Sequence, residues 1–268
     1  MVSLPSLQSS FDALLVQTVD GITTITFNRP DRLNALDETA RTEFLAVLRA
    51  VDEDVATRVV ILTGAGRAFC AGGDIKAMSS EHSASRLAHE ARPVYSTGRH
   101  IIQAILAIEK PIIAKVNGPA MGLGATLALF CDLVLMGEDA SIADTHVKVG
   151  LTAGDGGAVI WPLLIGPMRA KELLLTGRAV KGVEAAEIGL VNSAHPADEL
   201  DAAVLALAET LRDLPAYAVR STKASVNRMV GQAAHNTLDA SLSWEHLSMS
   251  DYEHHAAIER FAVRRSGS

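Results

Sequence analysis

Two side chains in the segment THVKVGLTAGDGG, residues 145–157, have the chemistry to move a proton. His146 titrates near neutral pH, and Asp155 follows nine positions later in a stretch rich in glycine. An aspartate that hydrogen-bonds a histidine fixes its tautomer and stabilises the imidazolium, and the glycines could turn the chain back far enough for the two to meet. Two non-catalytic roles fit equally well, because Asp155 could N-cap the helix expected after it and His146 could be a buried pocket histidine. Asp144 is expected at a strand end or on the surface.

Two glycine-rich turns, Ala71–Asp74 and Asn117–Gly124, could supply the other half of an active site. Each follows a short apolar strand and opens a helical stretch, where the first backbone N–H groups have no partner inside the helix. Glycine leaves room for a ligand atom to approach these groups. Two such turns side by side could aim two N–H groups at one oxygen, which is the arrangement of an oxyanion hole. Each stretch by itself is equally compatible with an ordinary tight turn.

Strands and helices that could position these residues follow one another along most of the chain. LLVQTVDGITTITFN predicts two strands joined at Asp20-Gly21, a dipeptide that favours a tight hairpin. RVVILTG and PIIAKVNG are apolar enough to be strands covered on both faces, and residues 37–54 have helical spacing. Residues 198–265 are helical and more charged. This order indicates an α/β core over residues 1–197 and a helical oligomerisation region over residues 198–268.

Composition excludes several classes of partner. The 268 residues carry a formal net charge of −7, and the basic residues are scattered. A nucleic-acid groove needs lysine and arginine on one face, and no apolar run approaches the ~20 residues that cross a bilayer, so we expect neither nucleic-acid nor membrane partners. The start of the chain has no basic leader before an apolar stretch. Cys70 and Cys131 lack ligand-like spacing, which favours buried thiols in a reducing cytoplasm and no metal site.

Several motifs, taken in chain order, resemble the enoyl-CoA hydratase/isomerase family, also called the crotonase superfamily. They include RAFCAGGDIKAM, KPIIAKVNGPAMGLGATLALFCDLVL and AEIGLV, and the pair F-x-A-G-x-D and N-G-x-A-x-G-x-G is a specific signature. The resemblance implies an α/β fold built as a right-handed spiral of ββα units, with a C-terminal helical region that packs trimers. It also implies an acyl-CoA thioester as substrate, no cofactor apart from the coenzyme A of that substrate, and a homotrimer or a dimer of trimers.

The same resemblance implies which residues hold the thioester. Its oxygen would lie between the backbone N–H groups of Ala71 and Leu123, where the enolate formed during the reaction is stabilised. Gly72, Gly73 and Asp74, together with Ala71 and Leu123, would line the path of coenzyme A.

The sequence departs from the family at both catalytic glutamates. Their positions are occupied by Thr126 and His146, where a pair of carboxylates normally holds a water and transfers the proton. Thr126 can hold a water, but its hydroxyl cannot act as a base near neutral pH. His146 can act as one.

Three functions stay open at this point. The first is a hydratase/isomerase-type enzyme that adds or moves water or protons at the 2,3 position, with His146 as acid/base, Asp155 as its partner and a water on Thr126. The second is a hydrolase that uses a water activated by His146 and Asp155 on a thioester or on the C–C bond of a β-dicarbonyl. This His-Asp spacing resembles a branch of the superfamily that cleaves cyclic β-diketones. The third is an acyl-CoA-binding protein without catalysis.

Overall fold

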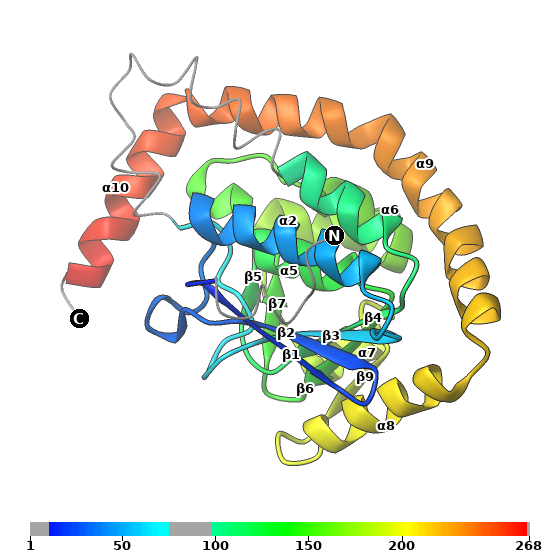
Figure 1. Ribbon diagram of the computed structural model, residues 1–268. Helices are drawn as coiled ribbons and strands as arrows, with labels where there is room; N and C mark the ends of the chain where they lie inside the picture. The colour runs from blue at the N-terminus through cyan, green and yellow to red at the C-terminus, as the bar shows by residue number, and fades with distance from the viewer. Residues whose placement is uncertain (1–10, 75–97, 267–268) are drawn as a thin grey trace.

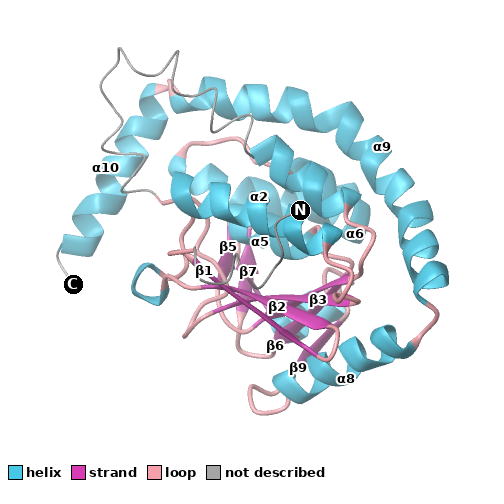
Figure 2. Ribbon diagram, viewed as in Figure 1, coloured by secondary structure: helices cyan, strands magenta, loops and turns pink. Residues whose placement is uncertain are grey.

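A computed structural model describes residues 11–74 and 98–266 of the chain, and the side chains of the last helix as far as Arg260. Most of the helical stretch expected after the first glycine-rich turn falls at residues 75–97, outside these ranges, and residues 98–107 are helical. The architecture is a mixed α/β core wrapped by long C-terminal helices (Figures 1 and 2). The predicted fold class is therefore confirmed at the level of α/β with a helical C-terminal region.

The main sheet begins with the predicted hairpin. Strands β1 (Leu14–Val19) and β2 (Ile22–Phe27) are antiparallel, with Val19 opposite Ile22. Asp20 and Gly21 both have positive φ, as a two-residue hairpin turn requires. All later strands of the sheet run parallel to β2 in the order β1-β2-β3-β4-β6-β9. These strands are β3 (Val59–Gly64), β4 (Ile112–Val116), β6 (Leu133–Gly137) and β9 (Ser193–His195).

Helices cover both faces of this sheet. Helix α2 (Glu38–Glu53) begins at Asp37, whose side chain accepts a hydrogen bond from the Ala40 N–H at 2.9 Å. Its buried stripe includes Phe44 and Val51, as the helical spacing predicts. Helix α8 (Leu200–Asp213) packs on the opposite face, against apolar side chains of the strands. Helix α8 belongs to the predicted C-terminal region, residues 198–268, but it packs on the α/β core. The boundary between the two regions after residue 197 stays a prediction.

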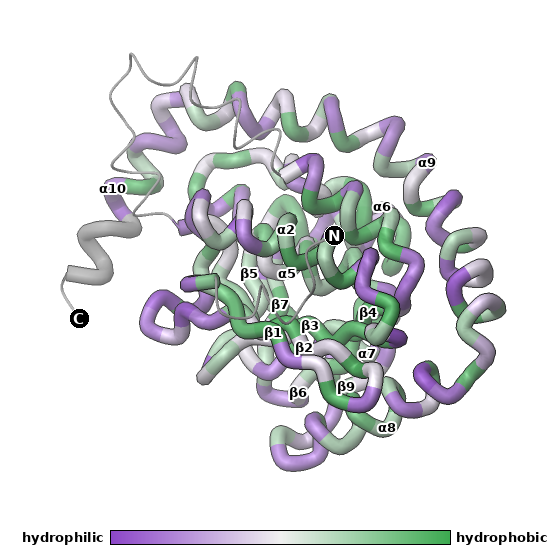
Figure 3. Tube along the Cα trace, in the orientation of Figure 1, coloured by the Kyte–Doolittle hydropathy of each residue, from purple (hydrophilic) through white to green (hydrophobic). Residues whose placement is uncertain are grey.

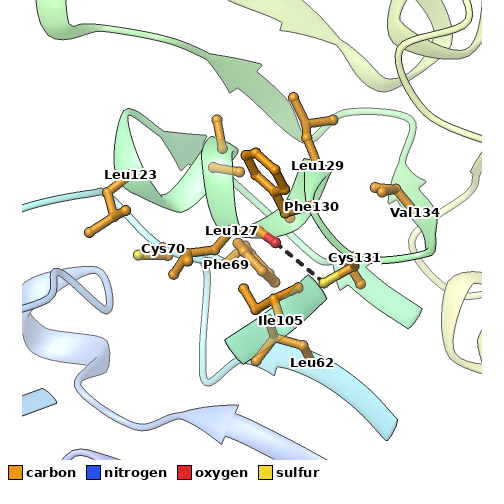
Figure 4. Packing of buried hydrophobic residues seen from close by; sticks show 14 of the residues in the cluster. Leu62, Phe69, Cys70, Ile105, Leu123, Leu127, Leu129, Phe130, Cys131 and Val134 are labelled. Carbon is orange, nitrogen blue, oxygen red and sulfur yellow. Dashed lines mark hydrogen bonds between the residues drawn. The ribbon is translucent and has the colours of Figure 1, made fainter. Parts of the chain in front are cut away.

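A second, smaller sheet holds the segments that carry the candidate site. Its order is β5-β7-β8, formed by β5 (Ala120–Met121), β7 (Ser141–Ala143) and β8 (Val180–Lys181). Helix α5 (Leu123–Leu129) starts directly after β5, and each of its seven residues is buried. Apolar side chains surround this helix, and the Cys131 thiol donates to Leu127 O at 3.3 Å (Figure 4). Cys70 and Cys131 are both buried free thiols, as predicted.

The remaining helices pack around the core or along its outside. They are the 3-10 helices η1 (Pro30–Arg32) and η2 (His146–Val149), and the α-helices α6 (Gly157–Thr176), α7 (Gly182–Glu187), α9 (Ala216–Met249) and α10 (Tyr252–Ser266). Helix α6 is kinked at Gly166, between Pro162 and Pro167. Helix α9 arches over α2 and α6 (Figure 3). Hydrophilic and apolar residues alternate along this helix, whereas the centre of the molecule is mainly apolar. Within the described ranges, no helix is both long enough and apolar enough to cross a membrane.

Candidate active site

His146 is held on a short 3-10 helix between β7 and α6. Helix η2 starts at His146 and ends at Gly150, and helix α10 packs against it, with His254 Nδ1 bonded to Val149 O. The His146 side chain is almost fully enclosed, with 10% of its surface exposed. The histidine is therefore fixed in a buried position by elements from two distant parts of the chain.

Two aspartates contact the two ring nitrogens of His146. Nδ1 lies 2.7 Å from Asp144 Oδ1, and Nε2 lies 3.2 Å from Asp155 Oδ2. Burial alone lowers the pKa of His146, but the charges of Asp155 and Asp144 and their hydrogen bonds raise it well above 6.5. Both ring nitrogens are then donors, and the residue is an imidazolium near neutral pH.

Asp155 is a partner of His146 and does not cap helix α6. The N-cap of that helix is Gly156, and no side chain caps it, so the capping role predicted as an alternative is wrong. Asp155 Oδ1 instead accepts a hydrogen bond from Thr126 Oγ at 2.8 Å. Burial raises the pKa of Asp155, but the His146 charge and the hydrogen bonds from His146 and Thr126 outweigh it and lower the pKa. The three predicted residues Thr126, His146 and Asp155 therefore form one connected group.

Two further carboxyl groups join this cluster, and the sequence did not identify them. Asp144 directly follows strand β7, as the strand-end alternative predicted, but the surface alternative is wrong. Asp144 is 1% exposed and binds His146 through the ring and the backbone N–H. Alternation along β7 gave no signal for it, since the consecutive residues Ile142 and Ala143 are both fully buried. The second is Glu245 of helix α9, with Oε1 at 4.0 Å from His146 Nε2.

The two glycine-rich turns lie against each other, next to His146. A Cβ added at Gly72 would lie 2.6 Å from Met121 O and 3.5 Å from Leu123 N. A Cβ added at Gly122 would lie 3.6 Å from His146 Cε1. Only glycine allows the first turn to approach the start of α5 this closely. The Leu123 N–H is the first of that helix and has no partner within it.

Ala71 cannot offer its N–H to a ligand in this conformation. That group donates to Leu33 O at 2.9 Å, because the segment before α2 pairs with residues 71–74. The Gly72 N–H faces the Cys70 thiol, whose pKa burial nevertheless raises to about 12. Leu36 pairs with this turn as in a parallel sheet: its N–H donates to Gly72 O, and its carbonyl oxygen accepts from the Asp74 N–H. The N–H of Gly73, which lies between these two residues, therefore points away from Leu36. The predicted donor Ala71 is thus occupied, and Gly73 is the residue in this turn whose N–H faces away from its neighbours.

Asp74, predicted on the path of coenzyme A, lies beside a structural ion pair. Arg29 Nη2 is 2.7 Å from Asp37 Oδ2 and 3.7 Å from Asp74 Oδ2. Asp37 is also the N-cap of α2. Arg29 therefore joins the start of α2 to the first glycine-rich turn.

Gly157, the first residue of α6, makes room for Asp144. A Cβ at Gly157 would overlap Asp144 Oδ2, so Gly157→Ala is expected to destabilise the protein by ~1–3 kcal/mol through overpacking. Urea unfolding followed by circular dichroism measures this change. Gly231→Ala is the control, because a Cβ at Gly231 in α9 meets no atom within 4 Å and should stabilise the helix by up to ~1 kcal/mol. Equal stability of Gly157→Ala and the wild type would contradict the close packing of Gly157 against Asp144.

Comparisons with known proteins place this architecture in a family. The model of the family described as enoyl-CoA hydratase/isomerase matches residues 17–267. A crotonyl-CoA hydratase from Syntrophomonas wolfei is 35% identical over 219 residues, which cover 81% of this chain and 82% of the relative. A 1,2-epoxyphenylacetyl-CoA isomerase from Escherichia coli is 29% identical over 255 residues, covering 94% and 96%.

A solved structure agrees with the sequence relatives. The crystal structure of an enoyl-CoA hydratase/isomerase from Mycobacterium paratuberculosis superposes with a TM-score of 0.87 at 34% identity, covering 94% of this chain and 99% of its own. These matches confirm the crotonase-type fold and the resemblance drawn from the glycine-rich motifs. The chain belongs to the enoyl-CoA hydratase/isomerase family, and it is an enzyme of the hydratase/isomerase kind.

Proposed function

We propose that this enzyme forms the enolate of an acyl-CoA thioester and moves a proton at the 2,3 position, with Thr126, His146 and Asp155 in place of the family's glutamate pair. The observation that carries the proposal is the position of His146, whose ring lies beside Gly122 and between two aspartates. A proton-transfer centre therefore sits next to the backbone N–H of Leu123. Both parts are needed to ionise a carbon next to a carbonyl group.

The oxyanion hole of this proposal consists of the Gly73 and Leu123 N–H groups. Leu123 was predicted, and Gly73 replaces Ala71, whose N–H donates to Leu33 O. Gly72, next to Gly73, approaches Leu123 N closely. Fixed N–H dipoles stabilise a developing oxyanion without having to reorganise, and one such donor contributes about 3 kcal/mol.

Asp155 is the base in this scheme. His146 donates from both ring nitrogens, so it cannot take a proton while both aspartates are ionised. The Asp155 carboxylate takes the Cα proton, and the electron pair of the broken C–H bond moves onto the thioester oxygen. The imidazolium stabilises the charge that remains, and Thr126 orients Asp155 through its hydroxyl. Return of the proton to another carbon completes an isomerisation, and addition of water at Cβ completes a hydration.

The hydrolase alternative draws support from the same pair. A His146–Asp155 contact of 3.2 Å would activate a water for attack on a thioester or on a β-dicarbonyl carbon, provided that His146 first passes a proton to one aspartate. Both ring nitrogens of His146 already face carboxyl groups, so this is the second candidate.

One experiment separates these functions. Purified enzyme is incubated in D₂O with saturated, enoyl and β-keto CoA esters and with a cyclic β-diketone, and the products are identified by mass spectrometry. Deuterium uptake at Cα supports enolate formation, and a gain of one water identifies hydration. Free coenzyme A or an opened ring indicates the hydrolase. Tight binding of an ester with neither exchange nor product would refute the proposal in favour of a non-catalytic acyl-CoA-binding protein.

The remaining expectations stay predictions. Coenzyme A enters as part of the substrate, and the names of two relatives, crotonyl-CoA hydratase and 1,2-epoxyphenylacetyl-CoA isomerase, refer to CoA esters. A homotrimer or dimer of trimers is supported by large apolar side chains exposed on the C-terminal helices, namely Trp244, Leu247 and Tyr252. A cytoplasmic location and the absence of nucleic-acid and membrane partners follow from composition alone.

A further inference from the structure

Glu245 reaches the candidate site from helix α9, far along the chain from the other members. Its side chain is 11% exposed, and Oε1 lies 4.0 Å from His146 Nε2. Asp155 Oδ2 lies 3.2 Å from that same nitrogen. Two carboxyl groups therefore flank one edge of the imidazole, while Asp144 occupies the other edge.

Helix α9 is attached to the glycine-rich loop around Glu245. Ser241 Oγ donates to Gly154 O at 2.9 Å, and Ser248 Oγ accepts from the Thr152 N–H at 3.2 Å. These two serines and Glu245 are spaced along one face of the helix. A Cβ at Gly154 would lie 2.6 Å from Glu245 Oε2, so the loop leaves space for this carboxyl group only because residue 154 is glycine.

The surroundings of Glu245 favour a neutral carboxylic acid. Its Oε2 is buried and has no hydrogen-bond partner among residues 11–74 and 98–266, which is costly for a charged oxygen. Burial raises the pKa of Glu245 from 4.5 to about 8, and the charges of Asp155 and Asp144 add to this, whereas those of His146 and Arg41 oppose it. Asp155 has a lowered pKa in the same cluster. Paired titratable groups with pKa values shifted in opposite directions divide the roles of acid and base between them.

We propose that Glu245 is the second acid/base residue of this site, protonated at rest, which delivers a proton to the substrate carbon after Asp155 has removed one. The proposal rests on the proposed function, since it assigns the second proton transfer at the same enolate. The proton count balances. Asp155 gains the Cα proton, Glu245 releases its O–H proton to the new carbon, and the enolate electron pair forms the new C–H bond.

His146 lies where it can reset the two carboxyl groups. After turnover Asp155 is protonated and Glu245 is ionised, and Nε2 faces both of them. The imidazolium passes its Nε2 proton to Glu245 and regains one from Asp155. This step restores the resting state and needs no oxidant, metal ion or added base.

The variant Glu245→Gln tests this assignment, because glutamine keeps the size of the side chain and cannot release a proton as glutamic acid does. We expect overall turnover to fall by at least about 10²-fold, while deuterium uptake at Cα is retained, because it needs Asp155, His146 and the oxyanion hole but not Glu245. The wild-type rate should fall as the pH rises through about 8, where Glu245 loses its proton, and the residual rate of Glu245→Gln should lack this decline. Glu245→Asp should restore part of the turnover and the decline.

Glu209→Gln on α8 is the control, since Glu209 is 49% exposed and should leave turnover unchanged. Wild-type turnover and an unchanged pH profile in Glu245→Gln would overturn the inference and leave Glu245 a structural role. If Glu245→Gln lost Cα exchange as well as turnover, the inference would also be overturned, because the substitution would then have disturbed the whole site. Absence of exchange in the wild type on every ester is a different outcome, since it refutes the proposed function itself.

Discussion

Replacing His146 with glutamine is expected to lower kcat for Cα proton exchange by roughly 10²- to 10⁴-fold. Glutamine donates hydrogen bonds from its amide, but it carries no charge and cannot pass a proton on. Asp144 and Asp155 would then be buried without the cation between them, which raises the pKa of Asp155 and leaves a smaller fraction of it ionised to take the proton. KM for the thioester should change little, because Gly73 and Leu123 keep their N–H groups. Steady-state exchange in D₂O, followed by mass spectrometry, measures both constants.

Asp144→Asn is the matched control for this variant. The asparagine oxygen can still accept from His146 Nδ1, which lies 2.7 Å from Asp144 Oδ1, and the contact of His146 with Asp155 is untouched. We therefore expect a smaller loss of kcat than in His146→Gln. Removing one partner of a buried ion pair costs about 3–5 kcal/mol of stability, so thermal unfolding is measured for both variants first. Folded His146→Gln protein with undiminished exchange would remove His146 from the mechanism.

Local sequence signals were sufficient to predict the strands and the helix of the core and one contact in the candidate site. The hairpin at Asp20-Gly21, the buried strands β3 and β4 and helix α2 each depend on neighbouring residues, and each is present in the structure. The contact between His146 and Asp155 was predictable for a similar reason. A short loop rich in glycine joins the two, so few conformations separate them.

The rest of the site depends on packing between distant segments. Glu245 follows Trp244 in a helix that has the mixed polarity of a solvated surface helix, and only the packing of α9 on the loop at residues 152–154 makes it a buried acid. The spacing of Ser241, Glu245 and Ser248 was a weak signal, because serine on a helix is usually exposed. The prediction of Ala71 as a donor was wrong because its N–H pairs with Leu33 O, from a distant segment.

That failure shows what a motif can and cannot specify. Gly72 has a positive φ and Gly73 forms a bridge with Leu36, but which N–H of the glycine-rich segment at residues 71–74 faces a ligand depends on its partner segment. Here the partner is the stretch that leads into α2, with Leu33 O on the Ala71 N–H and Leu36 bridged to the following residues. A shift by one residue in an extended chain reverses the direction of the N–H. The Asp74 N–H donates to Leu36 O, so the N–H of Gly73, one residue earlier, points the other way, which makes Gly73 the proposed donor.

Leu123→Pro is expected to lower kcat by about 10²- to 10³-fold, the effect of losing one donor of an oxyanion hole. Proline has no N–H, and Leu123 is the first residue of α5, a position at which helices accept proline. The preceding Gly122 has φ 52° and ψ −123°. Their mirror image, with both signs reversed, is the extended conformation that a residue before proline adopts. Glycine has no side chain and adopts either form. The helix should therefore form, and kcat on the best ester from the D₂O screen gives the measurement.

Leu123→Ala separates the N–H from the side chain. The Leu123 side chain is 5% exposed and belongs to the main cluster of buried apolar residues (Figure 4). Both variants therefore lose apolar contacts, but only Leu123→Pro loses the donor. We expect Leu123→Ala to be less stable than the wild type by ~2–5 kcal/mol and to retain most of its kcat. Equal losses of kcat in the two variants would show that the Leu123 N–H does not hold the thioester oxygen. Enolate formation beside His146 would then need a different second donor, because Gly73 alone supplies one N–H.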